Sequence, residues 1–317
     1  MKGKQKVLGV VMVLAAGTMW GHTGLFVNIL SERGASAMTI SMLRLVFTFI
    51  LMALFILIFD PSFFKVSLRC IPYFFITGTI GMVGSSLFYF YAIQQTSMAV
   101  AAVLMYTSPT IVMLLSLAVF KDKFTWRHLL CCLLAFFGAA LTTGLLSGGI
   151  EYSLKGIMFG CLAGASYALY SVGSGLALRH GCSPMTISLY SFAFASVTIL
   201  IAGDVPELIR TVSADPVILP ISAAQALITC LLPYVLYTLG IRFTSPANAS
   251  IMSTIELVVA TLLGFFVLDE KLTFLGVLGI FLVIDSIVVL NLPHKKKNDS
   301  HESNESDDEK TRVKNEN

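Results

Sequence analysis

Ten long apolar blocks, separated by short polar gaps, constrain this chain more than any other feature of its sequence. The blocks cover residues 7–30, 36–59, 71–93, 97–120, 128–146, 155–178, 184–203, 217–240, 247–268 and 273–291. A helix needs about 20 residues to cross the apolar core of a bilayer, and each block has that length. Only 12% of the 317 residues are charged, whereas a soluble domain carries about 25% charged residues. We therefore predict an all-α integral membrane protein with ten transmembrane helices.

The distribution of Lys and Arg predicts the orientation of these helices. If the N-terminus lies in the cytoplasm, the inner segments hold Lys2, Lys4, Lys6, Lys65, Arg69, Lys121, Lys123, Arg127, Arg179, Arg242, Lys295, Lys296 and Lys297. The outer segments then hold only Arg33, Lys155, Arg210 and Lys271. Cytoplasmic loops are enriched in these residues, so we expect both termini on the cytoplasmic side of a bacterial plasma membrane. The polar tail, residues 293–317, cannot bury a core and is predicted to be disordered.

Composition also argues against several other classes of protein. The net charge is only +3 and the basic residues are scattered, so no nucleic-acid partner is expected. The six cysteines include no CxxC pair, which argues against a zinc site or a disulfide framework. We interpret them as small apolar residues packed between helices, and we expect no metal or other cofactor. The signatures HExxH, GxSxG and GxxxxGK(S/T) are absent, so neither an enzyme nor an ATP-driven pump is expected.

A repeat relates the two halves of the chain. The tetrapeptide MTIS begins at Met38 in "GASAMTISML" and again at Met185 in "GCSPMTISLY", an offset of 147 residues. Further along, an offset of 148 residues pairs "YFYAIQQTSMAVAAV" with "YTLGIRFTSPANASI" and "VFKDKFT" with "VLDEKLT". We interpret the chain as two homologous five-helix units, residues 1–147 and 148–292.

The odd number of helices in each unit has a topological consequence. The second unit must enter the membrane from the opposite side, so the two units form an inverted repeat about an axis in the membrane plane. Inverted repeats are common in secondary transporters, in which one half can adopt the conformation that its partner leaves. The repeat therefore predicts alternating access between an inward-open and an outward-open state.

Three stretches carry a resemblance to a known family. They are "AAGTMWGHTGLFVNIL" with the following "SAMTISMLRLVF", "QQTSMAVAAVLMYTSPTIVMLLS" and "STIELVVATLLGFFVLDEKLT". Over residues 7–292 the chain resembles the EamA-type branch of the drug/metabolite transporter superfamily. The resemblance implies ten helices in two five-helix repeats and export of amino acids or other small metabolites, often driven by protons. Where the family commonly has Glu-Pro in the ninth helix, this chain has Glu256-Leu257, so we expect less of a kink there.

Charged side chains inside the predicted spans are the first candidates for function, because each costs ~2.5–3.5 kcal/mol to place in the bilayer. Glu256 lies near the middle of the ninth span and could carry a proton across or hold a substrate ammonium; alternatively, it is permanently paired with Arg44 or hydrogen-bonded to Ser and Thr side chains. Arg44 in the second span could contact Glu256 or a substrate carboxylate; alternatively, it is a structural anchor, or its side chain extends to the membrane interface. Asp285, near the inner end of the last span, is interpreted as solvated.

Histidine and aromatic residues complete the predicted site. His22 could relay protons or be a hydrogen-bonded packing residue. Rings with a polar tip can line a cavity and stack on a substrate, whereas Tyr89, Tyr91 and Tyr237 have the depth of the interfacial aromatic belt. The predicted substrate-binding residues are Trp20, His22, Arg44, Tyr106, Tyr167, Tyr190 and Glu256, with Glu256 also coupling transport to protons.

These observations favour a secondary transporter that exports a small metabolite, such as an amino acid, with proton coupling. The alternative is a structural or regulatory membrane subunit, which would need neither the repeat nor the charges inside the spans. The expected partners are the small-molecule substrate and the lipid bilayer, and the chain could be a monomer or a homodimer. Pro109 and Pro233 should bend the fourth and eighth helices, either as gates or as static kinks.

Overall fold

The computed structural model describes the chain except for residues 1, 97, 122–124, 144–152, 269–270 and 293–317. The predicted tail and the boundary between the two predicted units lie outside the described residues. The first half contains α1 (Lys2–Gly21), α2 (Thr23–Glu32), α3 (Ala37–Phe59), η1 (Pro61–Phe64), η2 (Leu68–Cys70), α4 (Ile71–Phe75), η3 (Ile76–Gly84), α5 (Ser85–Gln95), α6 (Met98–Met105), α7 (Ser108–Phe120) and α8 (Trp126–Thr142). The second half contains α9 (Leu154–Arg179), α10 (Pro184–Ala202), α11 (Val205–Ala214), α12 (Ile218–Ala226), η5 (Leu227–Leu231), α13 (Leu232–Phe243), α14 (Pro246–Met252), α15 (Ile255–Val267) and α16 (Phe274–Asn291).

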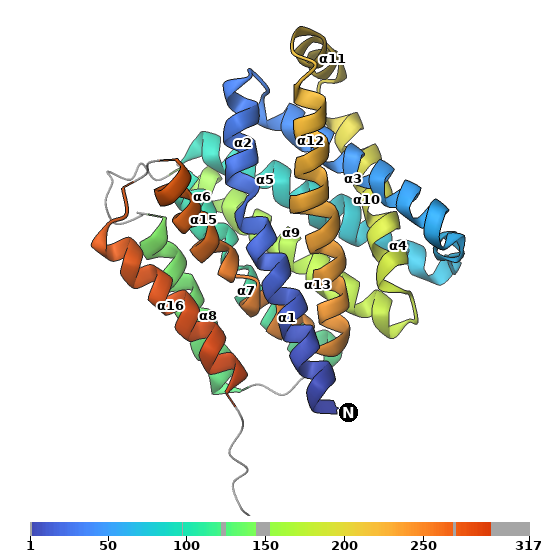
Figure 1. The fold of residues 1–317 in the computed structure, drawn as a ribbon. Helices are drawn as coiled ribbons and strands as arrows, with labels where there is room; N and C mark the ends of the chain where they lie inside the picture. The colour runs from blue at the N-terminus through green and yellow to red at the C-terminus, as the bar shows by residue number, and fades with distance from the viewer. Residues whose placement is uncertain (1, 97, 122–124, 144–152, 269–270, 293–317) are drawn as a thin grey trace, which may run out of the picture.

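The helices form a bundle in which α1 packs on α13, and α8 pairs with α16 at one edge (Figure 1). Within the described residues, nine helical segments are long and apolar enough to cross a membrane, and α8 is a further, shorter apolar helix. The observed segments begin and end within a few residues of the predicted spans where both can be compared. The predicted all-α membrane architecture is therefore confirmed.

The repeated MTIS motif marks the same helix start in both halves. Gly34 and Gly181 adopt positive φ angles of 84° and 82°, a left-handed conformation that glycine reaches without steric cost. Two residues later, the hydroxyl oxygens of Ser36 and Ser183 accept hydrogen bonds from backbone N–H groups at the starts of α3 and α10. The repeated segment therefore forms a left-handed turn followed by a helix N-cap in both halves.

One helix, α11, lies in a stretch for which no helix was predicted. Asp204 caps its start by accepting a hydrogen bond from the backbone N–H of Glu207, so its local signal is an N-cap followed by an acidic first turn. Figure 1 places α11 at the end of the bundle where α2 also ends. There Arg33 donates a 2.8 Å hydrogen bond to Asp215, which lowers the pKa of this carboxyl group.

Spans four and nine are interrupted at corresponding positions. The first break separates α6, which ends at Met105, from α7, which begins at Ser108. The second separates α14, which ends at Met252, from α15, which begins at Ile255. When the second half is aligned with the first at the 148-residue offset of the sequence repeat, the two breaks agree to within one residue. The π-helical segments η3 and η5 likewise occupy corresponding stretches of spans three and eight.

Span nine breaks without a proline. Ser253 Oγ donates a hydrogen bond to the carbonyl oxygen of Ser250 (2.9 Å), and Thr254 Oγ1 donates to that of Ile251 (2.7 Å). Such side-chain bonds to the backbone compete with the regular helical pattern. The ninth span is therefore interrupted although Leu257, and not proline, follows Glu256, and hydroxyl groups accompany the interruption.

The two expected proline bends coincide with helix distortions. Pro109 follows the break in span four and stands in the first turn of α7. Pro233 follows η5 and stands in the first turn of α13. Because proline lacks a backbone N–H, it interrupts the hydrogen-bond ladder at these points.

Glycine contacts between the halves are related by the same repeat. A Cβ atom built on Gly156 of α9 would lie 2.4 Å from Thr96 Cγ2, and one built on Gly9 of α1 would lie 3.0 Å from Thr244 Cγ2. Gly9 and Gly156 differ by 147 positions, and the two threonines differ by 148. The first helix of each half thus packs closely on the other half at equivalent positions, which small residues permit.

The interpretation of all six cysteines as packing residues is wrong for two of them. Cys70 forms a disulfide with Cys182, although the two are 112 residues apart in the sequence. The free cysteines are Cys131, Cys132, Cys161 and Cys230, of which all but Cys161 are buried. In the part of the chain that the structure describes, no group of three or more His, Cys, Asp or Glu side chains is placed to hold a metal ion.

Candidate functional site

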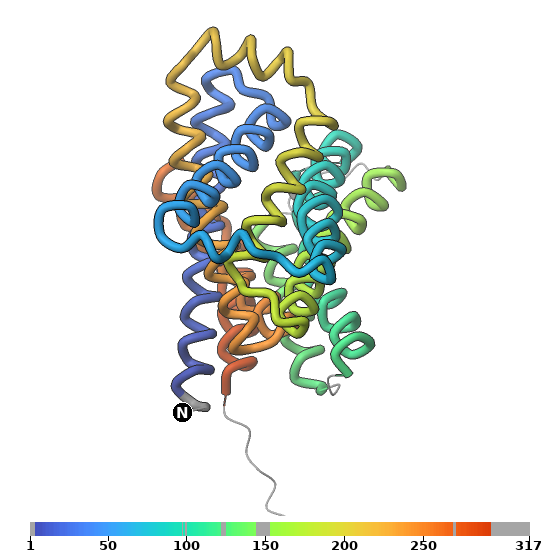
Figure 2. The backbone as a smooth tube through the Cα atoms, turned by 90° about the vertical axis from the view of Figure 1, so that its right-hand side faces the viewer, coloured from blue at the N-terminus to red at the C-terminus, as the bar shows by residue number. Residues whose placement is uncertain are grey.

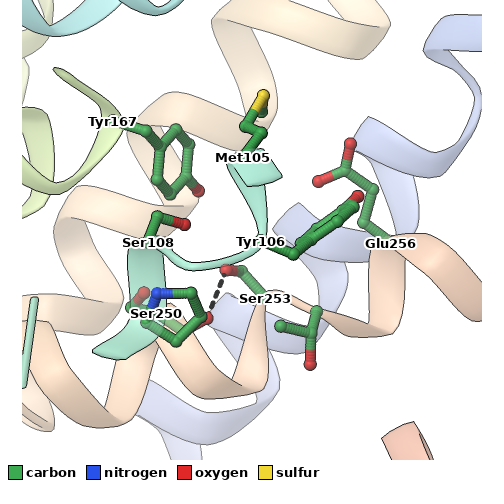
Figure 3. A pocket seen from close by; sticks show the side chains of 9 residues that line it. Met105, Tyr106, Ser108, Tyr167, Ser250, Ser253 and Glu256 are labelled. Atoms are coloured by element: carbon green, nitrogen blue, oxygen red, sulfur yellow. Dashed lines mark hydrogen bonds between the residues drawn. The ribbon is translucent and has the colours of Figure 1, made fainter. Parts of the chain in front are cut away.

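A small cavity lies where the breaks in spans four and nine meet (Figure 3). Its walls come from the α6–α7 break, the α14–α15 break and α9. The lining residues are Met105, Tyr106, Ser108, Pro109, Tyr167, Ser250, Ser253, Thr254 and Glu256. The side chains leave room for about one water molecule, so the site is nearly closed in this conformation. Three of the seven predicted substrate-binding residues, Tyr106, Tyr167 and Glu256, line this cavity.

The N-terminal ends of two half-helices face the cavity. Ser108 is the first residue of α7, and Glu256 lies in the first turn of α15. The N-terminal end of a helix carries a partial positive charge, which favours a nearby anion. The start of α7 therefore offers a positive helix end to an anionic group of a ligand.

Polar groups surround this carboxyl group. Glu256 is partly buried, and in Figure 3 its carboxylate and the hydroxyl end of Tyr106 lie on the same side of the cavity, across from Tyr167 and Ser250. The Tyr167 hydroxyl and Ser250 Oγ are buried and have no hydrogen-bond partner among the described residues. Buried polar groups are normally hydrogen-bonded, so these two hydroxyls are available to a polar ligand or to water.

An aromatic cluster lies behind Tyr167. The ring of Trp20 lies 6.3 Å from that of Tyr167, 5.1 Å from that of Tyr234 and 5.2 Å from that of Tyr237, measured between centroids. Tyr237 is fully buried and its hydroxyl forms a 2.8 Å hydrogen bond with Ser171 Oγ. Its assignment to the interfacial belt is therefore wrong. Trp20 supports the cavity through Tyr167 and does not line it.

Replacement of Tyr237 by phenylalanine should destabilise the protein. The change removes the hydrogen bond to Ser171 and leaves a fully buried hydroxyl without this partner, which costs about 1–3 kcal/mol. We expect a lower apparent melting temperature in detergent. The control is Tyr91→Phe, because the Tyr91 side chain is exposed. An equal decrease in both variants would contradict the prediction, as would full additivity of Tyr237→Phe and Ser171→Ala.

Arg44 lies on α3, outside the lining of the cavity. Thr48 Oγ1 donates hydrogen bonds to the carbonyl oxygens of Arg44 (2.6 Å) and Ala226 (3.4 Å), so this turn of α3 packs against α12. Arg44 Nε is buried and has no hydrogen-bond partner among the described residues. Arg44 and Glu256 do not form an ion pair; the pair found in the described chain joins Arg33 to Asp215.

Two further predicted residues lie away from the cavity lining. His22 separates α1 from α2, and its Nδ1 lies 2.9 Å from the carbonyl oxygen of Thr18. The Tyr190 hydroxyl donates a 2.7 Å hydrogen bond to the carbonyl oxygen of Phe64, and its ring stacks on that of Phe74. The structure therefore does not bring these side chains together with Glu256.

Sequence reasoning missed the small hydroxyl residues of the cavity, Ser108, Ser250, Ser253 and Thr254. A signal for them was present in the segments "TSPT" and "SIMSTIE", which interrupt otherwise apolar spans. Ser and Thr next to a helix break can satisfy the freed backbone groups inside a membrane. Such clusters at corresponding positions of two repeats therefore point to a site.

The fold and the cavity together define a class of protein: a polytopic membrane protein with a polar site between two interrupted helices, as in membrane transporters. The model of the EamA-like transporter family matches the chain twice, over residues 7–144 and 154–292. The chain therefore belongs to the EamA-like transporter family, which is part of the drug/metabolite transporter superfamily.

Similar proteins agree with this assignment. An "Uncharacterized transporter" of Archaeoglobus fulgidus is 28% identical over 205 residues, which are 63% of this chain and 70% of the relative. The "Uncharacterized inner membrane transporter YicL" of Salmonella typhimurium is 23% identical over 298 residues, which are 91% of this chain and 97% of the relative. A solved crystal structure with 16% identity shares the fold, with a TM-score of 0.73 over 89% of this chain and 96% of its own.

Proposed function

We propose that this membrane transporter is a secondary active carrier that moves a small amino acid by alternating access, with proton coupling and net export. The supporting observation is the pair of helix breaks at corresponding positions, with a polar cavity between them. In secondary transporters, interrupted helices place the ends of half-helices against the substrate. We further propose that both termini face the cytoplasm of a bacterial cell, as the distribution of Lys and Arg favours.

Alternating access requires two halves that can exchange roles, and we propose residues 1–147 and 148–292 as these inverted units. A Cβ atom on Gly164 would lie 2.9 Å from Thr107 Oγ1 at the first break, and one on Gly17 would lie 2.5 Å from Ile255 Cγ2 at the second. Each break is thus contacted by the first helix of the other half. Equivalent packing in both halves supports two conformations of similar free energy.

The chemistry of the cavity supports an amino acid as the substrate class. The Glu256 carboxylate can bind either a proton or a substrate ammonium, so the two would compete for one site. The hydroxyls of Tyr167 and Ser250, with the positive end of α7, can hold a substrate carboxylate. We propose that Arg44, whose Nε has no partner among the described residues, contacts this carboxylate in another state of the cycle.

The first test is transport by the purified protein in proteoliposomes with an imposed pH gradient. Labelled amino acids, polyamines and nucleosides are supplied separately, and empty liposomes measure passive leakage. We expect gradient-dependent flux of small amino acids only. Flux of polyamines or nucleosides alone would overturn the substrate class. Absence of flux for every class would favour a structural or regulatory subunit.

A further inference from the structure

The Cys70–Cys182 disulfide ties the first half of the molecule to the second. Cys70 ends η2, immediately before α4, and is only 4% exposed. Cys182 lies in the corner between α9 and α10 and is partly exposed. The segment after α3 crosses this side of the molecule to reach α4, beside the corner that holds Cys182 (Figure 2).

Around the disulfide, residues 60–75 meet residues 177–190 in a contact that we call the corner seam. Within it, the Tyr73 hydroxyl lies 3.3 Å from His180 Nε2, and the two rings are 4.9 Å apart. This polar contact is exposed and can exchange with water, so it limits opening only weakly. Thr186 Oγ1 and the Tyr190 hydroxyl also donate hydrogen bonds across the seam, and Phe74 and Ile187 are buried beside Cys70. These non-covalent contacts can break and re-form, whereas the disulfide opens only by a chemical reaction.

The corner seam lies on the side of the membrane where most of the basic residues are predicted to be. Lys65, Arg69 and Arg179 flank the two cysteines in the sequence, and such clusters favour the cytoplasmic side. Cytosolic thiols are kept reduced, and disulfides there usually act in catalysis or redox sensing. A permanent structural bridge is therefore not the role that this location favours.

We propose that Cys70 and Cys182 form a reversible redox-modification site that controls opening of the corner seam. In the oxidising direction, the Cys182 thiolate attacks a low-molecular-weight disulfide such as glutathione disulfide and displaces one glutathione thiolate. The Cys70 thiolate then attacks the Cys182 sulfur and displaces the second. The two thiols lose two protons and two electrons, and one glutathione disulfide becomes two molecules of glutathione.

Oxidation holds the start of α4 against the α9–α10 corner, so the two halves cannot separate at this end. Reduction leaves only the non-covalent contacts of the seam and permits separation. Opening of the seam is a property of the protein itself. Its effect on flux rests on the proposed transport function, because alternating access would require one end of the molecule to open.

The test uses the full-length protein in inside-out and right-side-out vesicles, treated with glutathione disulfide or with reduced glutathione. A maleimide–polyethylene glycol mobility shift reports the thiols, and hydrogen–deuterium exchange reports opening of residues 60–75 and 177–190. We expect reduction to speed exchange in these segments about tenfold, and glutathione to act only on inside-out vesicles. Cys182→Ser should exchange rapidly under all conditions. Cys161→Ser, which removes an exposed free cysteine, should keep the wild-type response.

Flux is measured on the same preparations so that failure of the two proposals can be separated. Redox-dependent exchange together with about threefold faster flux after reduction would support both proposals. Redox-dependent exchange without flux in any state would support the redox site and count against the transport function. No disulfide after oxidation, reduction only from the opposite side, or equal exchange in both redox states would overturn the redox site.

Discussion

Replacement of Glu256 by glutamine should reduce gradient-driven substrate accumulation in proteoliposomes by ~100-fold. The variant would lose the charge pair that we propose between Glu256 and the substrate ammonium, and losing one partner of such a buried pair costs about 2–5 kcal/mol. Glu256 is the only carboxyl group that lines the described cavity. Glutamine keeps the size and most of the hydrogen bonding of the side chain but can neither release a proton nor attract an ammonium. The measurement is the initial rate of labelled amino-acid flux with and without a pH gradient.

The matched control is Asp285→Asn, which removes a carboxyl group from a spanning helix without touching the cavity. Asp285 is exposed on α16 and does not line the site, so its replacement should leave coupling unchanged. Glu256→Asp should retain gradient-dependent flux at a lower rate, because the carboxyl group remains but is displaced by one methylene. Full coupling in Glu256→Gln would contradict the role of this residue and leave the transporter class intact.

Replacement of Gly78 by alanine should produce one of the largest losses of stability that a single methyl group can cause in this protein. Gly78 lies in η3 where this segment crosses α10, and an added Cβ would lie 2.2 Å from the carbonyl oxygen of Ser191. This oxygen belongs to the backbone, so the helices themselves must move apart. Overpacking of this kind costs about 1–3 kcal/mol or more, and we expect the apparent melting temperature to fall by at least about 5 °C.

The control for this experiment is Gly24→Ala on α2, where an added Cβ would meet no atom within 4 Å. Alanine favours helix more than glycine does, so this variant should be as stable as the wild type or slightly more stable. Thermal unfolding of both variants in the same detergent gives the comparison. A Gly78→Ala protein that melts with the wild type would show that η3 and α10 do not approach as closely as the structure indicates.

Features that arise between residues close in the chain could be predicted from the sequence. The spans follow from the length of apolar blocks, and the helix starts after Ser36 and Ser183 follow from N-caps that bond three residues ahead. Glu256 could also be identified as a candidate from its local sequence, because a carboxyl group is costly inside any span. The family match over both halves confirms the recognition that the repeated segments predicted.

Only the tertiary structure decided which polar residues share a site. Tyr106 and Tyr167 meet Glu256, whereas Arg44 and Tyr190 do not, because this depends on how each helix is rotated and where it breaks. A span that is apolar on every side carries little information about its rotation, since each face is equally compatible with lipid. The sequence alone determined the predicted spans and the carboxyl group in the middle of one of them, because both follow from positions along the chain. Helix packing determined the cavity and brought together Cys70 and Cys182 across 112 residues of chain.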